Sequence, residues 1–434
     1  MSLREKIDNS PMSGYQWLIV FMAVIMNLLD GFDVLALAFT AANIRAEFAL
    51  SAEQLGYLMS AGLFGMTAGS LFLAPLADKI GRRPLLLISV VMSALGMLGS
   101  ALIEHYQALA FWRVITGLGV GGILVGTNVL TSEYSSRKWR SFAISVYAAG
   151  FGIGAVLGGM FAMTLQAEYG WRSVYLAGFG LTALCFVILL AWLPESIDFL
   201  TTKQPKNAQQ KLNSIARKLG FSGEWPLPEK TQQATKLPFT QVFNHEYRRS
   251  TLLIWIAFFA IMFSFYFVSQ WTPALLTQAG MTKEQGVSVG MMISLGGTCG
   301  ALFYGLLASR WSVRRVLILF TLLSAVVAVI FILSSSVLWL AMLFGVLVGA
   351  LMNGCISGLY TLNPAIYAAD IRSTGVGLSL GVGRFGAILA PIAAGKLLDL
   401  GWEKQSLYEG VALVLLLAVC ALALLKTKSA VKSV

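Results

Sequence analysis

Charge is scarce in this sequence, and so are the residues that build metal and disulfide sites. Only 12% of its 434 residues are charged, and there are two histidines and four cysteines. The histidines, His105 and His245, lie far apart, and all the cysteines fall within apolar runs, so neither a metal motif nor a disulfide framework is indicated. We also find no nucleotide-binding glycine loop and no paired Ser and His arrangement. The cysteines are Cys185, Cys299, Cys355 and Cys420.

Apolar residues, by contrast, are abundant. They account for 57% of the chain, and the mean hydropathy is +0.76, far above that of ordinary soluble domains. Runs of about 20 apolar residues can cross a hydrocarbon core of roughly 30 Å. The sequence therefore predicts an all-α integral membrane protein with twelve transmembrane helices. The predicted spans are 17–40, 54–76, 84–103, 108–131, 140–164, 172–193, 250–272, 286–308, 315–335, 337–361, 373–398 and 405–425.

The net charge of +11 could indicate a nucleic acid partner, but the positions of the charges explain it otherwise. Nearly all Lys and Arg residues outside the spans fall on one side of the membrane, and only Arg45, Arg172, Lys283 and Lys404 fall on the other. By the positive-inside rule, both termini and the central loop are predicted to be cytoplasmic. The basic excess sets topology, and we expect no nucleic acid partner.

A polar segment divides the chain into two halves of six spans each. We predict an N-terminal bundle over 1–193, a cytoplasmic loop over 194–249 and a C-terminal bundle over 250–434. Within the loop, Ala208, Leu212, Ile215 and Leu219 recur at helical spacing and predict a surface helix.

The two halves resemble each other. "APLADKIGRRP" aligns with "GLLASRWSVRR", which pairs Arg83 with Arg314, and "RKWRSFAISVY" aligns with "AADIRSTGVGL", which pairs Arg140 with Arg372. Parallel repeats of this kind predict two pseudo-symmetric bundles with a substrate site near mid-membrane between them.

The loop "ADKIGRR" between spans 2 and 3 resembles the signature of the major facilitator superfamily, with Ala74 where glycine is usual. "RVITGLGVGG" in span 4 and "LPES" after span 6 resemble further motifs of that superfamily, and "DGFD" in span 1 resembles the aromatic acid:proton symporter family. The resemblance implies the two-bundle fold, a transporter rather than an enzyme, and roles for Arg113, Glu133, Arg372 and Arg384.

Two acids, Asp30 and Asp33, interrupt the first span. They are three residues apart and so project from nearby parts of one helix face. A carboxylate at membrane depth is costly unless it is paired or hydrated, and two close ones do not both ionise easily. We interpret them as proton carriers, the alternative being a pair of acids satisfied by neighbouring backbone groups and hydroxyls.

Two arginines lie well inside predicted spans. Arg113 has a depth similar to that of Asp33, so the two can pair, either as a static link or as a pair whose strength changes during transport. Arg384 lies near the bilayer centre in "GVGRFG", far from any acid in its half. Its guanidinium is predicted to bind the substrate carboxylate, with pairing to a protein acid or carbonyl as the alternative.

Other polar side chains in the second half are candidates for lining a substrate cavity. On span 7, Tyr266 and Gln270 share a face with Phe259 and Phe263, which also suits plain packing. Span 10 offers three hydrogen-bonding side chains for the same role, Asn353, Tyr360 and Asn363.

A set of charged residues at the cytoplasmic edge is predicted to form a switchable salt-bridge latch, although topology alone could explain it. The glycine runs "GFGIGAVLGG" and "GVGLSLGVG" are predicted to permit close helix packing. The latch candidates are Asp78, Arg82, Arg83, Glu133, Arg140 and Arg372.

These features favour a monomeric, proton-coupled symporter of the inner membrane that imports a small organic carboxylate, with an aromatic acid such as a benzoate or hydroxybenzoate favoured by the family resemblance. Protons are the expected coupling ion, and no cofactor is expected. The alternatives are a proton-driven exporter of amphipathic compounds and a symporter for a non-aromatic acid such as muconate.

Overall fold

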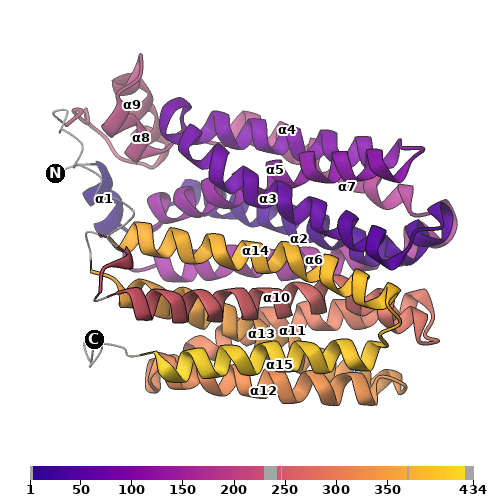
Figure 1. Ribbon diagram of the computed structural model, residues 1–434. Coiled ribbons are helices and arrows are strands. Elements are labelled where there is room, and N and C mark those ends of the chain that lie inside the picture. Colours follow the sequence, from indigo (N-terminus) through magenta and orange to yellow (C-terminus); the bar gives the residue numbers. More distant parts are fainter. Residues whose placement is uncertain (1–2, 229–241, 246, 369–370, 426–434) are drawn as a thin grey trace. The chain divides into compact units, whose positions relative to one another are not determined.

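In the computed structural model, residues 3–228, 242–245, 247–368 and 371–425 are described. All their regular elements are helices, and twelve of these helices are long and apolar enough to cross a membrane, as predicted (Figure 1). The first six long helices are α2 (Gly14–Phe48), α3 (Ala52–Ile80), α4 (Arg82–Ala101), α5 (Tyr106–Tyr134), α6 (Arg140–Tyr169) and α7 (Arg172–Trp192). The other six are α10 (Arg248–Gln278), α11 (Lys283–Arg310), α12 (Val313–Ser334), α13 (Leu338–Leu362), α14 (Arg372–Asp399) and α15 (Lys404–Leu424).

The remaining helices are short, and the first three lie outside the spans, whereas the last ends the candidate span Leu338–Ile366. They are α1 (Leu3–Asn9), α8 (Ile197–Lys203), α9 (Ala208–Lys218) and the 3₁₀ helix η2 (Asn363–Ile366). The helix predicted in the central loop is α9, whereas α1 and α8 carry too few residues for a periodic signal. The largest difference in span length is in α2, which continues to Phe48 rather than ending at residue 40.

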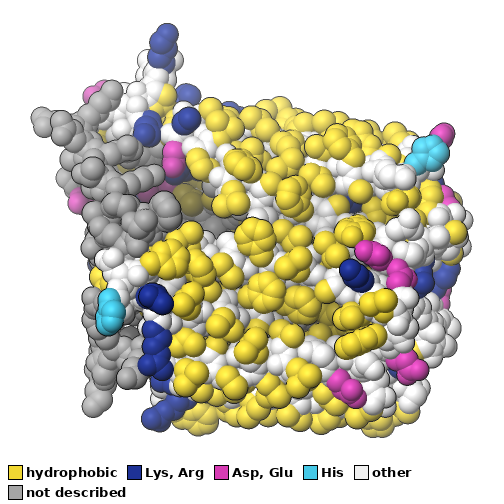
Figure 2. Space-filling view, viewed as in Figure 1, with side chains coloured by type: hydrophobic (Ala, Val, Ile, Leu, Met, Phe, Trp, Pro, Cys, Tyr) yellow, Lys and Arg dark blue, Asp and Glu magenta, His cyan; other side chains and the backbone are white. Residues whose placement is uncertain are grey.

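Large apolar side chains on the outside of the helices fit a lipid environment. Phe72 is 74% exposed, Leu306 69% and Leu413 68%, which would be unfavourable in water. On the face that Figure 2 shows, apolar side chains cover the length of the helices and charged side chains gather near their ends. Helices satisfy their own backbone hydrogen bonds, which is what spanning a bilayer requires.

The chain clusters into two compact units. Unit 1 comprises residues 1–36, 64–161 and 165–234, and unit 2 comprises 37–63, 162–164 and 235–434. Three continuous helices, α2, α3 and α6, therefore contribute to both units. Within unit 1, α4 packs against α5 and α7; within unit 2, α10 packs against α14, α11 against α13 and α12 against α15.

Glycines let the backbones of α2 and α6 approach closely in unit 1. A Cβ atom on Gly31 would collide with the Phe151 carbonyl, and one on Gly154 would collide with that of Leu28. The packing role predicted for "GFGIGAVLGG" is confirmed. For "GVGLSLGVG" in α14 it holds at Gly375 and Gly383, which abut the side chains of Tyr367 and Phe258, but not at Gly377 and Gly381, where a Cβ atom would meet nothing within 4 Å.

A hydrophobic cluster in unit 1 holds the short helices α1, α8 and α9. Leu3 and Ile7 of α1 are 3% and 0% exposed, and they share this cluster with Leu212 and Ile215 of α9. Ser196 caps α8 by accepting a hydrogen bond from the Phe199 N–H at 3.0 Å. The segment after α7 is thus fixed against unit 1.

Candidate functional site

Asp33 and Arg113 form a buried ion pair in unit 1. Arg113 Nη1 lies 2.7 Å from Asp33 Oδ1, and Arg113 Nη2 donates to the Asp33 carbonyl at 2.9 Å. Both residues are nearly inaccessible, at 2% and 3% exposure. The pairing expected from their similar depth is present, and the guanidinium also lies 5.8 Å from the centre of the Tyr175 ring. A charge pair this deep is held by hydrogen bonds as well as by attraction.

Asp30 is as buried as Asp33 but lacks its cation. The residue is 2% exposed, and its Oδ2 atom has no hydrogen-bond partner in the described part of the chain. A carboxyl group in such a place is far cheaper when it is protonated. The two acids of span 1 therefore have different environments, one paired with Arg113 and one not.

A polar network that the sequence did not reveal lies one turn from Asp30. Asn27 Nδ2 donates to the Tyr147 carbonyl at 2.7 Å, and Thr127 Oγ1 is 3.0 Å from the Tyr147 hydroxyl. These residues join α2, α5 and α6 inside unit 1. Each looks unremarkable in a membrane helix, so only the fold brings them together.

In unit 2, Arg384 Nη1 donates to the Tyr266 hydroxyl at 3.4 Å. Its side chain is half-buried, and Gly377 and Gly381 lie on the same face of α14 at helical spacing. A Cβ atom on either glycine would meet nothing within 4 Å, so these two glycines clear space on the face that carries Arg384. The arrangement offers a cation and a hydroxyl beside open volume.

The other predicted lining residues are spread over α10 and α13. Phe259 and Phe263 stack at 6.0 Å, and Gln270 is buried at 2% exposure. The Tyr360 side chain is 46% exposed, and its ring lies 6.2 Å from that of Phe258.

Two asparagines of the same region face away from open volume. Asn353 lies against α11, where a Cβ atom on Gly297 would collide with its amide. Asn363 is fully buried, and both of its amide atoms lack hydrogen-bond partners within the described residues.

At the cytoplasmic edge, Asp78 and Arg82 form an ion pair of 2.7 Å, with 62% of the Asp78 side chain exposed. The backbone N–H groups of Arg82 and Arg83 both donate to Glu195 Oε1, at 2.7 and 3.1 Å. Glu195 belongs to "LPES" and binds the start of α4, a role that the motif alone did not predict. An acid at a helix N-terminus is favourable because it accepts these free N–H groups.

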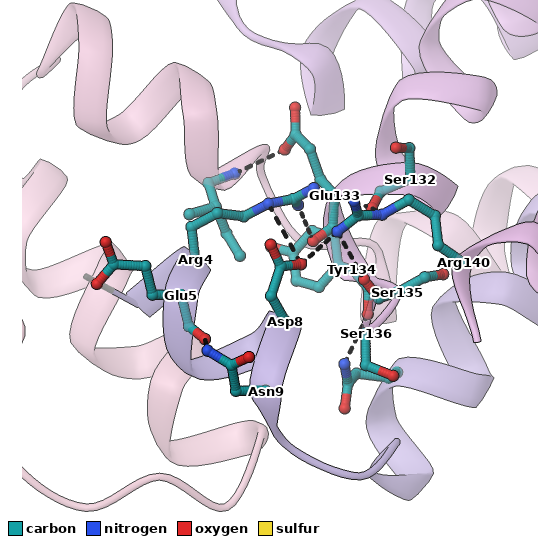
Figure 3. Close-up of polar contacts among 12 residues, drawn as sticks. Arg4, Glu5, Asp8, Asn9, Ser132, Glu133, Tyr134, Ser135, Ser136 and Arg140 are labelled. Atoms are coloured by element: carbon teal, nitrogen blue, oxygen red, sulfur yellow. Dashed lines mark hydrogen bonds and ion pairs between the residues drawn. The ribbon is translucent and has the colours of Figure 1, made fainter. Parts of the chain in front are cut away.

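Glu133 and Arg140, both candidates for the latch, bind other groups rather than each other. The Glu133 carboxylate accepts hydrogen bonds from Ser196 Oγ at 2.9 Å and from the Ile197 N–H at 3.0 Å. Arg140 is paired with Asp8 of α1 and also donates to the Ser132 carbonyl at 3.1 Å. Figure 3 shows Asp8 between Arg140 and Arg4, and Arg4 in turn donates to the Glu133 carbonyl.

Arg372 begins α14 in unit 2, as Arg140 begins α6 in unit 1. Its Nε donates to the Tyr367 carbonyl at 3.4 Å, as Arg140 Nη2 donates to that of Ser135 at 3.3 Å. The predicted gate residues thus lie at helix ends in both units. Asp8 and Glu195 are the partners that sequence reasoning missed.

These features define a multi-pass membrane protein whose polar machinery is buried inside helical units. The family description "Major Facilitator Superfamily" matches residues 20–301 and 288–434, and the chain belongs to that superfamily of transporters. It is a transporter rather than an enzyme.

Individual relatives show which transporters within the superfamily this chain resembles. The chain is 33% identical to a gallate transporter of Pseudomonas putida over 92% of this chain and 90% of that one. It is 31% identical to the 4-hydroxybenzoate transporter PcaK of the same organism, over 93% and 91% of the two chains. Among solved structures, the xylose transporter XylE from E. coli, in a partially occluded inward-open conformation, has a TM-score of 0.75 at 15% identity. That match covers 97% of this chain and 100% of the other and supports the fold.

Proposed function

We propose that this protein is a proton-coupled symporter that imports an aromatic carboxylate across the bacterial inner membrane by alternating access. The named relatives that carry gallate and 4-hydroxybenzoate support the substrate class. The observation that carries the coupling is the pair of buried acids, with Asp33 bound to Arg113 and Asp30 lacking a partner for Oδ2 among the described residues.

Asp30 is the proton carrier in this proposal. Because it lies away from a cation, its carboxyl group can take up a proton without breaking an ion pair. A negative-inside potential opposes entry of a monoanion by about 2.3 kcal/mol per 100 mV, and a proton carried with the anion removes that opposition. Protons are the coupling ion, and no cofactor is needed.

Arg384 is the substrate anchor. A planar guanidinium can bind both oxygens of a carboxylate, and the space cleared by Gly377 and Gly381 gives a ligand room beside it. The Tyr266 hydroxyl accepts a hydrogen bond from Arg384 and orients its guanidinium. The stacked Phe259 and Phe263 rings on α10 offer an apolar surface for an aromatic ring.

The charge asymmetry supports cytoplasmic termini. The functional unit in this proposal is the monomer.

The test is transport by purified protein in proteoliposomes. Labelled gallate, 4-hydroxybenzoate, benzoate and muconate are supplied outside, with the vesicle interior more alkaline. We expect accumulation of at least one aromatic acid, and an uncoupler should abolish accumulation but spare exchange of labelled for unlabelled substrate. Accumulation that persists without a proton gradient would exclude symport. Muconate as the preferred substrate would select the non-aromatic alternative, and drug-like cations moving against the gradient would select the exporter.

A further inference from the structure

Two cations lie close to the C-terminal end of α7, a place that the proposed function does not use. Arg83 of α4 donates from Nη2 to the Leu190 carbonyl at 2.8 Å. Lys218 of α9 lies with Nζ 5.6 Å from the centre of the Tyr15 ring, and the Tyr15 hydroxyl donates to the Trp192 carbonyl at 3.3 Å. Side chains from α2, α4 and α9 thus meet at the last turn of α7, and all of them belong to unit 1.

The face of α7 that leads to this turn is apolar and open. Leu184, Val187 and Leu190 follow one another at intervals of three residues, so they are neighbours on the helix surface. All three side chains are at least half exposed. Because α7 is one of the candidate membrane spans, this face suits the acyl chains of a lipid.

Trp192 and Tyr15 indicate where this face meets the membrane surface. The Trp192 side chain is 52% exposed, and Tyr15 is half-buried. Tryptophan and tyrosine are enriched at the level of the lipid headgroups, because each has an apolar body and a polar tip. A lipid whose chains lie along α7 therefore has its headgroup at the depth of Arg83 and Lys218. The charge asymmetry supports the cytoplasmic leaflet, whose surface potential is negative.

The two cations at this depth lack an acidic partner. Among the described residues, neither Arg83 nor Lys218 forms an ion pair. Glu195 lies at the same helix end, but it accepts hydrogen bonds from the backbone N–H groups of Arg82 and Arg83. The Leu190 carbonyl engages one nitrogen of the Arg83 guanidinium, a group that carries five N–H donors in all. The end of α7 therefore offers positive charge and hydrogen-bond donors to an anion.

From these contacts we propose that Arg83, Lys218, Tyr15 and Trp192 bind the headgroup of an anionic phospholipid such as phosphatidylglycerol at the end of α7. A guanidinium can bind two oxygens of a phosphate, and an ammonium group attracts the phosphate as a point charge. The acyl chains lie along the exposed face of α7. A zwitterionic headgroup brings an ammonium group of its own toward these cations, so it binds less well. The bound lipid connects α9, a helix outside the spans, to the membrane surface.

Trp192 allows the site to be followed by fluorescence. The purified full-length protein in detergent is titrated with phosphatidylglycerol whose acyl chains carry bromine, which quenches a tryptophan that it contacts. The quenching of Trp192 is the difference between the unmodified protein and Trp192→Phe. Phosphatidylcholine with the same brominated chains is the reference lipid. No substrate and no proton gradient are needed, so the outcome is independent of the proposed transport function.

Quenching of Trp192 should saturate, and half-maximal quenching should need less phosphatidylglycerol than phosphatidylcholine. Lys218→Gln should raise the half-maximal concentration of phosphatidylglycerol about fivefold, the effect expected of one basic residue near an anionic lipid. The value for phosphatidylcholine should stay the same. Lys218→Glu should raise the phosphatidylglycerol value further, because its carboxylate repels the phosphate.

Lys206→Gln is the matched control. Lys206 is also an exposed lysine, but it precedes α9, so the 11 residues of that helix, roughly 16 Å, separate it from Lys218. This variant should bind phosphatidylglycerol as the unmodified protein does, and monodisperse elution should show that each variant is folded. Equal quenching of Trp192 by the two lipids would overturn the proposal, as would an unchanged phosphatidylglycerol value in Lys218→Gln. Equal losses in Lys218→Gln and Lys206→Gln would also overturn it, because they would indicate diffuse attraction rather than a site.

Discussion

Arg83 and Arg314, which the internal repeat aligns, make the same contact in the two units. Arg83 Nη2 donates to the Leu190 carbonyl near the end of α7 at 2.8 Å, and Arg314 Nε donates to the Leu422 carbonyl near the end of α15 at 2.9 Å. Each arginine stands at the start of the third span of its half and holds the free carbonyls at the end of the sixth.

The equivalence predicts similar losses of stability. Arg83→Ala and Arg314→Ala should each lower the melting temperature of the purified protein by a few degrees, because a hydrogen bond from a charged group to a helix end contributes about 1–2 kcal/mol. Arg315→Ala, at an exposed neighbour, is the control. Thermal unfolding followed by tryptophan fluorescence measures all three melting temperatures. A decrease for only one of the two arginine variants would mean that the equivalent contacts do not contribute equally to stability.

Removing one partner of the buried ion pair should destabilise the protein more than removing both partners. Asp33→Asn leaves the Arg113 guanidinium buried without its counter-charge, and a destabilisation of about 3–5 kcal/mol is expected. Adding Arg113→Gln should recover much of that loss, because the unpaired charge is then absent. The same unfolding assay decides, and a double variant no more stable than Asp33→Asn would show that the pair does not act through its charge.

Asp30→Asn should separate coupling from transport. Asparagine keeps the shape and hydrogen bonding of the side chain but cannot release a proton. We expect gradient-driven accumulation to fall at least about tenfold while exchange continues, a difference larger than 1.4 kcal/mol. Glu409→Gln, at an acid on α15 that Gln405 contacts, is the control. Normal accumulation by Asp30→Asn would transfer the role of proton carrier elsewhere.

Arg384 should discriminate between a carboxylate and its amide. Arg384→Lys keeps the charge but loses the planar fork, so affinity for an aromatic acid should fall, and Arg384→Gln should reduce it about tenfold to a hundredfold. The uncharged amide of the same acid should lose much less. Calorimetry on purified protein measures both ligands, and equal losses for acid and amide would assign Arg384 to structural support.

Gly81 is the position where a methyl group should do most harm at the cytoplasmic edge. Its φ of 105° disfavours any other residue, and a Cβ atom there would collide with the Glu195 carboxylate. Gly81→Ala should therefore lower the melting temperature, whereas Gly180→Ala, where a Cβ atom meets nothing within 4 Å, should not. Tolerance of Gly81→Ala would mean that Glu195 can move without loss.

Much of the fold could be predicted because hydropathy and glycine spacing are local signals. Twelve apolar runs predicted twelve long helices, and the glycines around Gly154 predicted close packing before any partner helix was known. The α9 helix followed from the spacing of Leu212 and Ile215. The short helix α1 could not be predicted, because seven residues are too few to show a period.

The candidate site could be predicted only where a residue type is costly at membrane depth. Asp30, Asp33, Arg113 and Arg384 were conspicuous for that reason. The polar network of Asn27, Thr127 and Tyr147 was not, because these residue types cost little in an apolar helix and gain meaning only from the fold. Asp8 was equally hidden, since nothing in the sequence placed α1 beside Arg140.

The docking of α1 has a practical consequence for handling the protein. Leu3 and Ile7 are already in a hydrophobic cluster, and Arg4 and Asp8 contact the ends of α5 and α6. A purification tag or fluorescent fusion joined directly before Leu3 would begin within one helical turn of these contacts and would compete with them for space. A fusion at the other end, beyond Leu424 where α15 finishes, leaves this cluster intact and is the better choice for preparing the protein.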